Sequence, residues 1–160
     1  MKKLLMATAA IATMATGVYA DAHGERYVVI THTQGTDPFW PVVEKGARDA
    51  AAAGATIEYN FDASGDMAGM AKLIEAAAAS DPSGIVVSLP DAAALGPAIK
   101  AASDSGIPVI TMNSGLESSA EVGALMHVGQ PERDAGFAAG TRAAAEGVTN
   151  GLCLNQEAFI

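Results

Sequence analysis

The amino-acid sequence predicts an α/β domain, a doubly wound sheet of parallel strands with helices on both faces. Apolar, β-rich runs alternate with helical stretches, and a new strand begins roughly every 25–30 residues. This spacing is typical of βαβ units, whose crossover connections make neighbouring strands parallel. The loops between the units differ in sequence, which argues against a solenoid of repeats.

The first unit consists of two strands and the helix between them. We predict strands over residues 27–33 and 56–61, because both are rich in β-branched and aromatic types. A helix is expected from about 38 to 53, with Gly54 as its C-cap. Its predicted core face follows the 3.6-residue period and consists of Phe39, Val43, Ala47, Ala50 and Ala51.

A second helix is expected to begin at a polar cap, for which Ser64 and Asp66 are both suitable. The apolar residues of this helix again repeat at helical spacing, and they are Met67, Met70, Ala71, Ile74 and Ala78. Gly84 then precedes a third predicted strand over residues 85–89, a run of valine, isoleucine, serine and leucine.

Pro97 determines where we expect the third helix to begin. Proline lacks a backbone N–H and is best tolerated in the first turn of a helix. We therefore predict a turn over residues 91–95 and a helix from about Gly96 to Gly106. The fourth strand is expected over 107–112, with its only proline near the start of the strand.

The pattern changes after Gly115. Residues 116–122 are predicted to be a polar surface stretch, followed by a short strand over 124–128 and a helix from about 132 to 146. A further buried strand is expected at 151–155, only five residues before the last residue of the sequence. A parallel strand with no neighbour or following helix has uncovered faces, so we expect the sequence to be a fragment.

The amino terminus has the features of a secretory signal peptide, which we place at residues 1–22. Two lysines precede an apolar run over residues 4–15, which is too short to span a bilayer. Small residues allow cleavage after Ala20 or after Ala22. The alternative, a buried helix, is disfavoured because no polar face accompanies the apolar one. No lipobox cysteine is present, so we expect periplasmic export without a lipid anchor.

The composition excludes several classes of partner. The net charge is -9, and it becomes -11 when the two leader lysines are removed, or -10 if Asp21 leaves too. With no basic patch, no nucleic-acid partner is expected. Cys153 is the only cysteine, in an apolar run, and we expect a buried thiol. The three histidines show no metal-ligand spacing, so neither a metal nor a cofactor is predicted.

From Tyr27 to Gln130 the sequence resembles the type I periplasmic binding proteins of ABC importers, in the ribose- and galactose-binding cluster. The residues that carry this resemblance are Asp37-Pro38-Phe39-Trp40 after the first strand, the strand from Gly84 to Pro90 with its Asp91 turn, Gly106 to Thr111 followed by Asn113-Ser114, and His127 to Gln130. The last of these segments is similar to the first crossover between the two lobes of the family.

The resemblance implies two Rossmann-like lobes joined by three crossovers that close on a ligand by hinge motion. It places the N-terminal ligand-binding lobe at 23–127, a hinge crossover at 128–131 and the incomplete start of a second lobe at 132–160. The implied function is an extracytoplasmic solute receptor that binds a sugar and delivers it to the membrane permease of an ABC importer. Ribose-binding relatives carry Asp-Arg where this chain has Asn113-Ser114, which argues against ribose itself.

A sugar offers hydroxyls on its rim and C–H groups on its faces, so a receptor needs amides or carboxylates together with aromatic rings. Trp40 is the first candidate, because its predicted face carries Glu44 and Arg48 rather than the alanines; packing on a loop is the alternative. Phe39 suits the core and the ligand equally. Asp37 is a candidate ligand for a hydroxyl or a simple helix cap.

Asn113 follows the fourth strand and could pair with two hydroxyls, or form a turn. The remaining candidates lie at strand ends or the hinge and comprise Gln34, Ser88, Asp91, Ser114 and Gln130. A strand role is favoured for His32 and His127, whereas Asn155 and Glu157 are expected to border the cleft from the second lobe.

Other function classes have less support in the sequence. An enzyme would need a nucleophile–base pair, a metal cluster or a phosphate loop, and G-x-S-x-G, H-E-x-x-H, P-loop and G-x-G-x-x-G motifs are all missing. Transcription factors resembling the lactose repressor share the lobe fold but begin with a helix-turn-helix, where this chain has its leader. A receptor for an autoinducer, polyol or nucleoside stays open as the alternative to a sugar receptor.

Overall fold

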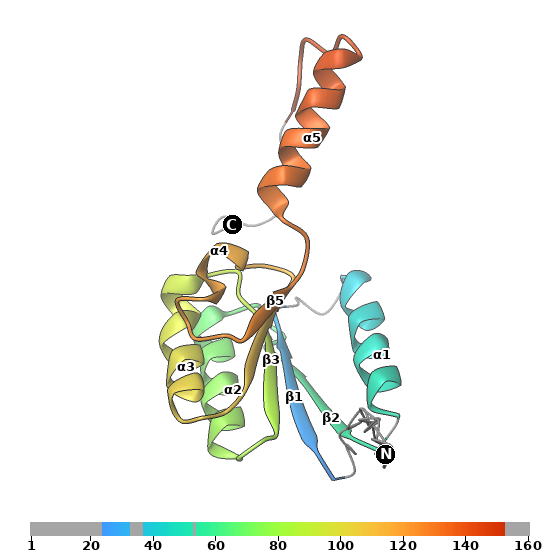
Figure 1. Ribbon diagram of the computed structural model, residues 1–160. Helices are drawn as coiled ribbons and strands as arrows, with labels where there is room; N and C mark the ends of the chain where they lie inside the picture. Colours follow the sequence, from blue (N-terminus) through green and yellow to red (C-terminus); the bar gives the residue numbers. More distant parts are fainter. Residues whose placement is uncertain (1–23, 33–36, 53, 153–160) are drawn as a thin grey trace, which may run out of the picture.

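The computed structural model describes residues 24–32, 37–52 and 54–152, and it contains one parallel sheet flanked by helices (Figure 1). The strand order is β2-β1-β3-β4-β5, and every neighbouring pair is parallel. The strands are β1 (Arg26–Thr31), β2 (Thr56–Phe61), β3 (Gly84–Ser88), β4 (Val109–Met112) and β5 (Met126–Val128). The helices are α1 (Phe39–Ala51), α2 (Met67–Ala79), α3 (Ala92–Asp104), α4 (Leu116–Ser119) and α5 (Glu132–Ala145).

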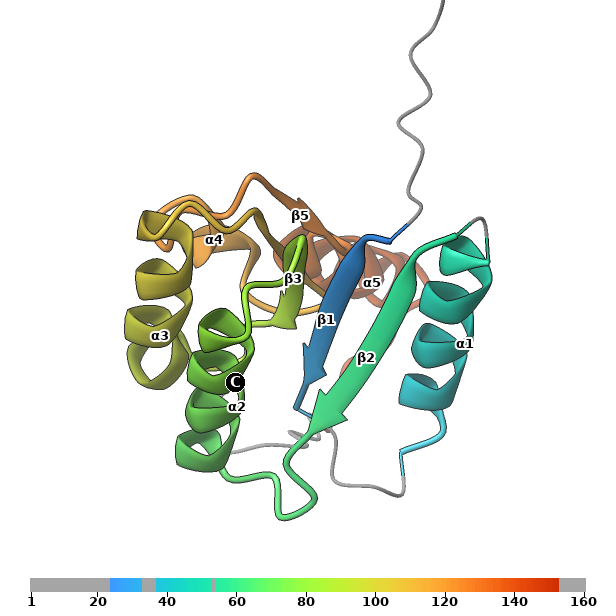
Figure 2. The ribbon, with the colours of Figure 1, turned by 90° about the horizontal axis from the view of Figure 1, so that it is seen from below.

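Helices cover both faces of the sheet, as the doubly wound prediction requires. Helices α2 and α3 lie on one face and α1 on the other (Figure 2). Alternating residues of β1 serve the two sides: Val28 and Ile30 pack with α2 and α3, whereas Val29 packs with α1. A strand that is buried on both faces reads as a continuous apolar run, which is why the fold class could be predicted from the sequence. The predicted fold class is confirmed.

The predicted start of the third helix near Gly96, after a turn, is wrong. Helix α3 begins five residues before Pro97 and includes it. The carboxylate of Asp91 accepts the backbone N–H groups of Ala93 at 2.9 Å and Ala94 at 3.0 Å, so the first turn is already capped. Proline at this position removes only one helical hydrogen bond. The cap and the burial of the helix against the sheet outweigh that loss.

The predicted core face of α1 is correct for Val43 and Ala47 but wrong at Phe39, because Trp40 is the buried aromatic residue. Trp40 is buried, with 5% of its surface exposed, whereas Phe39 is 48% exposed. The indole packs with Val29 and Met112 on the sheet, and Val43 lies against the same cluster. Trp40 has the largest apolar surface on this alanine-rich helix, and burial of that surface determines which side of the helix meets the sheet.

The region after β4 contains more structure than the sequence predicted. The stretch 116–122, expected to be polar surface, forms the short helix α4 and buries Ser119 and Val122. Helix α5 extends away from the sheet (Figure 1), and none of its residues is buried, including Phe137, which is 77% exposed. The strand predicted at 151–155 and Cys153 lie mostly or wholly outside the described residues, and Gly151 and Leu152 are not in a strand.

The turn after β4 depends on a glycine. Gly115 has a φ of +92°, in the left-handed region, and a Cβ at this position would lie 2.5 Å from both Cβ and O of Leu89. The backbone N–H of Leu89 also donates to Ser114 O over 3.2 Å. Close approach and positive φ both exclude a side chain here. None of the described helices is long and apolar enough to cross a membrane.

The buried position of Trp40 gives a first prediction. Trp40→Ala should lower the free energy of unfolding by about 3–5 kcal/mol, because the substitution leaves a cavity between α1 and the sheet. Phe39→Ala is the matched control on the neighbouring residue, and it should cost only about 1 kcal/mol because half of that ring is already exposed. Urea unfolding measures both. Equal costs for the two variants would show that Trp40 does not anchor the helix.

Gly115 gives a second prediction, with Gly106 as its control. Both glycines have nearly the same positive φ, +92° and +94°, but a Cβ at Gly106 would meet nothing within 4 Å. Gly106→Ala should therefore cost only the backbone strain, about 1–2 kcal/mol. Gly115→Ala should cost clearly more, because Leu89 must also move. Thermal unfolding that ranks the two variants in the reverse order would contradict this account of the turn.

Candidate ligand-binding site

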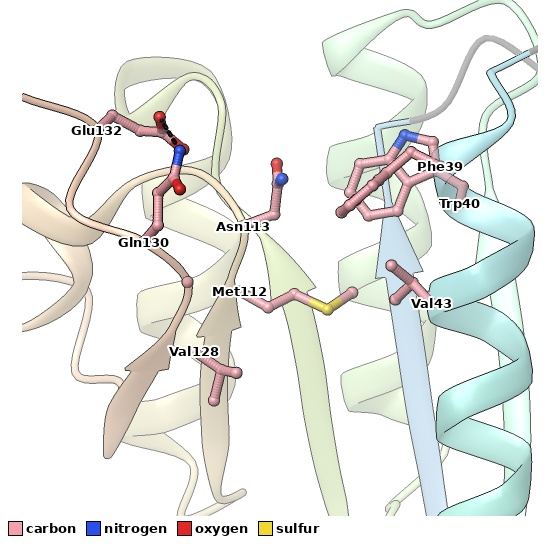
Figure 3. A pocket seen from close by; sticks show the side chains of 9 residues that line it. Phe39, Trp40, Val43, Met112, Asn113, Val128, Gln130 and Glu132 are labelled. Atoms are coloured by element: carbon pink, nitrogen blue, oxygen red, sulfur yellow. Dashed lines mark hydrogen bonds between the residues drawn. The ribbon is translucent and has the colours of Figure 1, made fainter. Parts of the chain in front are cut away.

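A pocket of about 430 Å³ lies at the carboxyl ends of β4 and β5, beside the first turns of α1 (Figure 3). In open α/β sheets this edge is where ligands bind, because the loops after neighbouring strands diverge there. The residues that line it come from α1, from the end of β4 and from the segment that follows β5. They are Phe39, Trp40, Val43, Met112, Asn113, Val128, Gly129, Gln130 and Glu132.

Helix α1 supplies the aromatic wall of the pocket. The rings of Phe39 and Trp40 lie with their centroids 5.1 Å apart and their planes at 80°, and Val43 lies one turn further along the helix (Figure 3). Asp37 Oδ1 accepts the backbone N–H of Phe39 over 2.9 Å, which fixes the start of the helix. The bond occupies one carboxylate oxygen of Asp37, which precedes the N-cap residue Pro38, so ligand binding by Asp37 stays a prediction.

The end of β4 supplies the floor and one amide. The Met112 side chain extends toward α1, and Asn113 stands between the aromatic wall and the residues after β5 (Figure 3). Asn113 has a φ of +61°, a conformation that asparagine tolerates better than most residues. Its backbone N–H donates to Val128 O over 2.9 Å, and its Oδ1 accepts the hydroxyl of Ser114 over 2.8 Å. The side-chain NH₂ thus remains available as a donor at the pocket.

The segment after β5 supplies the polar wall. Gln130 Nε2 donates to Glu132 Oε2 over 2.9 Å, on the side of the pocket opposite Phe39 and Trp40 (Figure 3). Both side chains are exposed in the described residues. The pocket thus has an apolar aromatic side and a side with amide and carboxylate groups, and among its lining residues none carries a positive charge.

His127 lies beneath the pocket rather than in it. Its Nδ1 is 2.9 Å from Thr111 Oγ1, which in turn lies 2.6 Å from Ser119 Oγ. Its Nε2 is buried and has no hydrogen-bond partner among the described residues. A Cβ at Gly129 would collide with this nitrogen, so the pocket wall at Gly129 is made of backbone alone.

The half-buried His32 and the buried Ser88 form a second pair, and the His32 ring contacts Trp40. Ser88 is fully buried at the end of β3 and accepts the backbone N–H of His32 over 3.1 Å. Burial lowers the pKa of His32 from 6.5 to about 4, while the nearby carboxylate of Asp37 acts in the opposite direction. The imidazole is therefore neutral at the pH values where most proteins function.

Four of the residues predicted from the sequence meet in the pocket: Phe39, Trp40, Asn113 and Gln130. Ser88 does not line the pocket but accepts the backbone N–H of His32, and Asp91 caps α3. Ser114 lines a separate groove of about 520 Å³ beside Leu89, Pro90 and Ser118. Gln34, Asn155 and Glu157 lie outside the described residues.

Five lining residues were missed by the sequence analysis. Met112, Val43 and Val128 carry no polar group, and their types alone do not distinguish a pocket wall from a core. Gly129 has no side chain to indicate a role. Glu132 was findable, because it follows the predicted hinge and is the first residue of the next helix. Among the described residues, no group of three or more His, Cys, Asp or Glu side chains could hold a metal ion.

Comparisons with known proteins agree on one family. The chain matches a family model described as a periplasmic binding protein domain over residues 27–154. A carbohydrate transporter from Acidothermus cellulolyticus 11B, solved with myo-inositol, is 45% identical, with a TM-score of 0.74, over 78% of this chain and 43% of that one.

Two further structures are similar. The sugar-binding protein of a sugar ABC transporter from Bacillus halodurans is 33% identical, with a TM-score of 0.67, over 76% of this chain and 41% of that one. A periplasmic ribose ABC transporter protein from Conexibacter woesei is 30% identical, with a TM-score of 0.68, over 78% and 41%. A comparison with curated protein sequences finds no match.

The chain thus spans somewhat over two fifths of the length of these structures. The resemblance to the binding proteins of sugar ABC transporters, first indicated by the strand-end motifs, is confirmed over most of the described residues. The chain belongs to the periplasmic binding protein family.

Proposed function

We propose that the protein containing this chain is an extracytoplasmic receptor that binds a neutral sugar or cyclic polyol between two lobes and delivers it to the permease of an ABC importer. The observation that carries this proposal is the composition of the pocket. Phe39 and Trp40 offer aromatic surface for the C–H face of a ring, and the amides of Asn113 and Gln130 lie where they could pair with its hydroxyls.

The charges around the pocket favour a neutral ligand. Among the residues that the structure describes, Glu132 is the one ionisable residue that lines the pocket, and the Asp37 carboxylate accepts the backbone N–H of Phe39 at the start of α1. A sugar acid or sugar phosphate would bring a negative charge next to these carboxylates without a cation in the lining residues to balance it. The relative solved with myo-inositol supports extending the ligand class from sugars to cyclic polyols.

The proposed organisation follows the boundaries expected from the sequence. Residues 23–127 form the ligand-binding lobe, 128–131 the hinge crossover, and 132–160 the start of the second lobe. This division is supported by α5, which extends away from the sheet and buries none of its residues (Figure 1). A second lobe packed around α5 would cover such a helix and bring further polar groups to the open side of the pocket.

The proposed role places the protein outside the cytoplasm. Residues 1–22 are proposed as a signal peptide cleaved after Ala20 or Ala22, and the mature receptor as periplasmic and free of a lipid anchor. A receptor role, rather than an enzyme, is supported by the family model of periplasmic binding proteins and by the Bacillus halodurans structure, which is named a sugar-binding protein.

Substitution of Asn113 gives a third prediction. Asn113→Gly removes the amide while permitting the left-handed backbone, so the fold should be retained. Ligand affinity should fall by about 1–3 kcal/mol, because ligand hydroxyls lose a partner in a dehydrated site. Calorimetric titration of the whole protein with myo-inositol, D-galactose and other neutral sugars measures this loss.

Asn60 provides the matched control for this experiment. Its side chain also makes a hydrogen bond, donating from Nδ2 to Glu58 Oε1 over 2.9 Å, but it lies on β2 and does not line the pocket. Asn60→Gly should leave affinity unchanged. If Asn113→Gly binds as tightly as the unmodified protein, or if no neutral sugar or polyol binds at all, the proposed site or ligand class is incorrect.

A further inference from the structure

Trp40 is flanked by two rings that meet it at nearly right angles. The centroid of Phe39 lies 5.1 Å from that of Trp40 with an interplanar angle of 80°. The centroid of His32 lies 4.9 Å away with an angle of 79°. Both are edge-to-face arrangements, which add about 0.5–1.5 kcal/mol beyond simple burial in aromatic pairs. The indole plane is therefore defined by its neighbours as well as by its own helix.

The imidazole of His32 is itself held by one serine. The Ser88 hydroxyl oxygen accepts the His32 backbone N–H over 3.1 Å, and the ring Nδ1 lies 2.8 Å from the same oxygen. Ser88 is fully buried at the end of β3, the strand that pairs with β1 at the centre of the sheet. One buried hydroxyl thus holds both the backbone of His32 and its ring, and the ring bond restricts rotation of the imidazole.

His32 does not line the pocket, whereas Trp40 does. Among the described residues, Trp40 is the pocket-lining residue whose ring the imidazole contacts, so we expect an effect of the imidazole on a ligand to pass through the indole. Stacking of an aromatic ring on a sugar face depends on the plane of that ring, since a tilt exchanges face contact for edge contact. The residue that holds the indole plane consequently influences which sugar face the pocket accepts.

We propose that His32, anchored by Ser88, is a positioning residue that fixes the plane of the Trp40 indole and so sets the affinity and stereochemical selectivity of the pocket. This inference rests on the proposed function. The sequence analysis favoured a strand role for His32; the structure places it directly after β1 in contact with the pocket tryptophan.

The fourth prediction compares His32→Asn, His32→Phe and Ser88→Ala in the whole protein. His32→Asn removes the ring, and Ser88→Ala removes its anchor. Both should increase the fast motion of the indole in fluorescence anisotropy decay, taken as the difference from the same variant with Trp40→Phe, and both should weaken ligand binding roughly twofold to tenfold. His32→Phe keeps a planar ring against the indole but loses the ring bond to Ser88 Oγ, so it should weaken binding less than His32→Asn and about as much as Ser88→Ala.

Ser83→Ala is the matched control. Ser83 Oγ accepts the backbone N–H of Arg26 over 3.1 Å, the same type of bond between β1 and the β3 region, at the far end of the strands. This variant should change neither indole motion nor affinity. The ligand is whichever of myo-inositol, D-galactose and D-ribose raises the melting temperature most, and the ratios of affinity among the three report selectivity.

The outcomes separate the positioning role from the proposed function. In a Trp40→Phe background, His32→Asn should lose most of its effect on affinity, because the indole through which it acts is gone. If His32→Asn lowers the melting temperature but leaves indole motion and affinity unchanged, His32 is only a packing residue. If it weakens binding equally with and without Trp40, it contacts the ligand directly. If none of the three ligands binds, the proposed function fails, while the indole motion still decides the positioning role.

Discussion

The burial of Trp40 between α1 and the sheet is the interaction on which the rest of the site depends. The indole packs on Val29 and Met112 at the centre of the sheet, and this contact fixes the rotation of the helix. Because the helix is fixed in this way, the preceding residue, Phe39, is left half-exposed at the pocket. Trp40 is thus both a core residue and part of the pocket wall. A substitution of Trp40 therefore changes the stability of the fold and ligand binding together.

The fold could be predicted because its signals repeat along the chain. The first four predicted strands alternate with helices, which indicates a parallel sheet, and the structure has these strands in one parallel sheet together with β5. The predictions were wrong where the position of a helix or of its core face was inferred from a single residue. Pro97 was expected to mark a helix start, but the Asp91 cap forms the first turn before it. Trp40 was placed away from the core face of α1, but it packs in one cluster with Val43 and Ala47, whereas Phe39 is half-exposed.

The candidate site was predicted less completely than the fold. Polar residues at strand ends were recognised, because topology brings the carboxyl ends of parallel strands together. The strand order does not determine which of these side chains face the ligand and which accept hydrogen bonds from backbone N–H groups. Asp37 and Asp91 accept N–H groups at helix starts, whereas Asn113 presents an amide to the pocket. A single sequence does not show that an apolar residue such as Met112, or a glycine such as Gly129, lines a pocket.

The most direct measurement of the central claim is a crystal structure of the whole protein with a bound neutral sugar or polyol. The account predicts a ligand ring with a C–H face against Phe39 and Trp40, and a hydroxyl within hydrogen-bond distance of the Asn113 amide. A ligand seated instead in the groove beside Leu89, Pro90 and Ser118, with no contact to either aromatic ring, would contradict it.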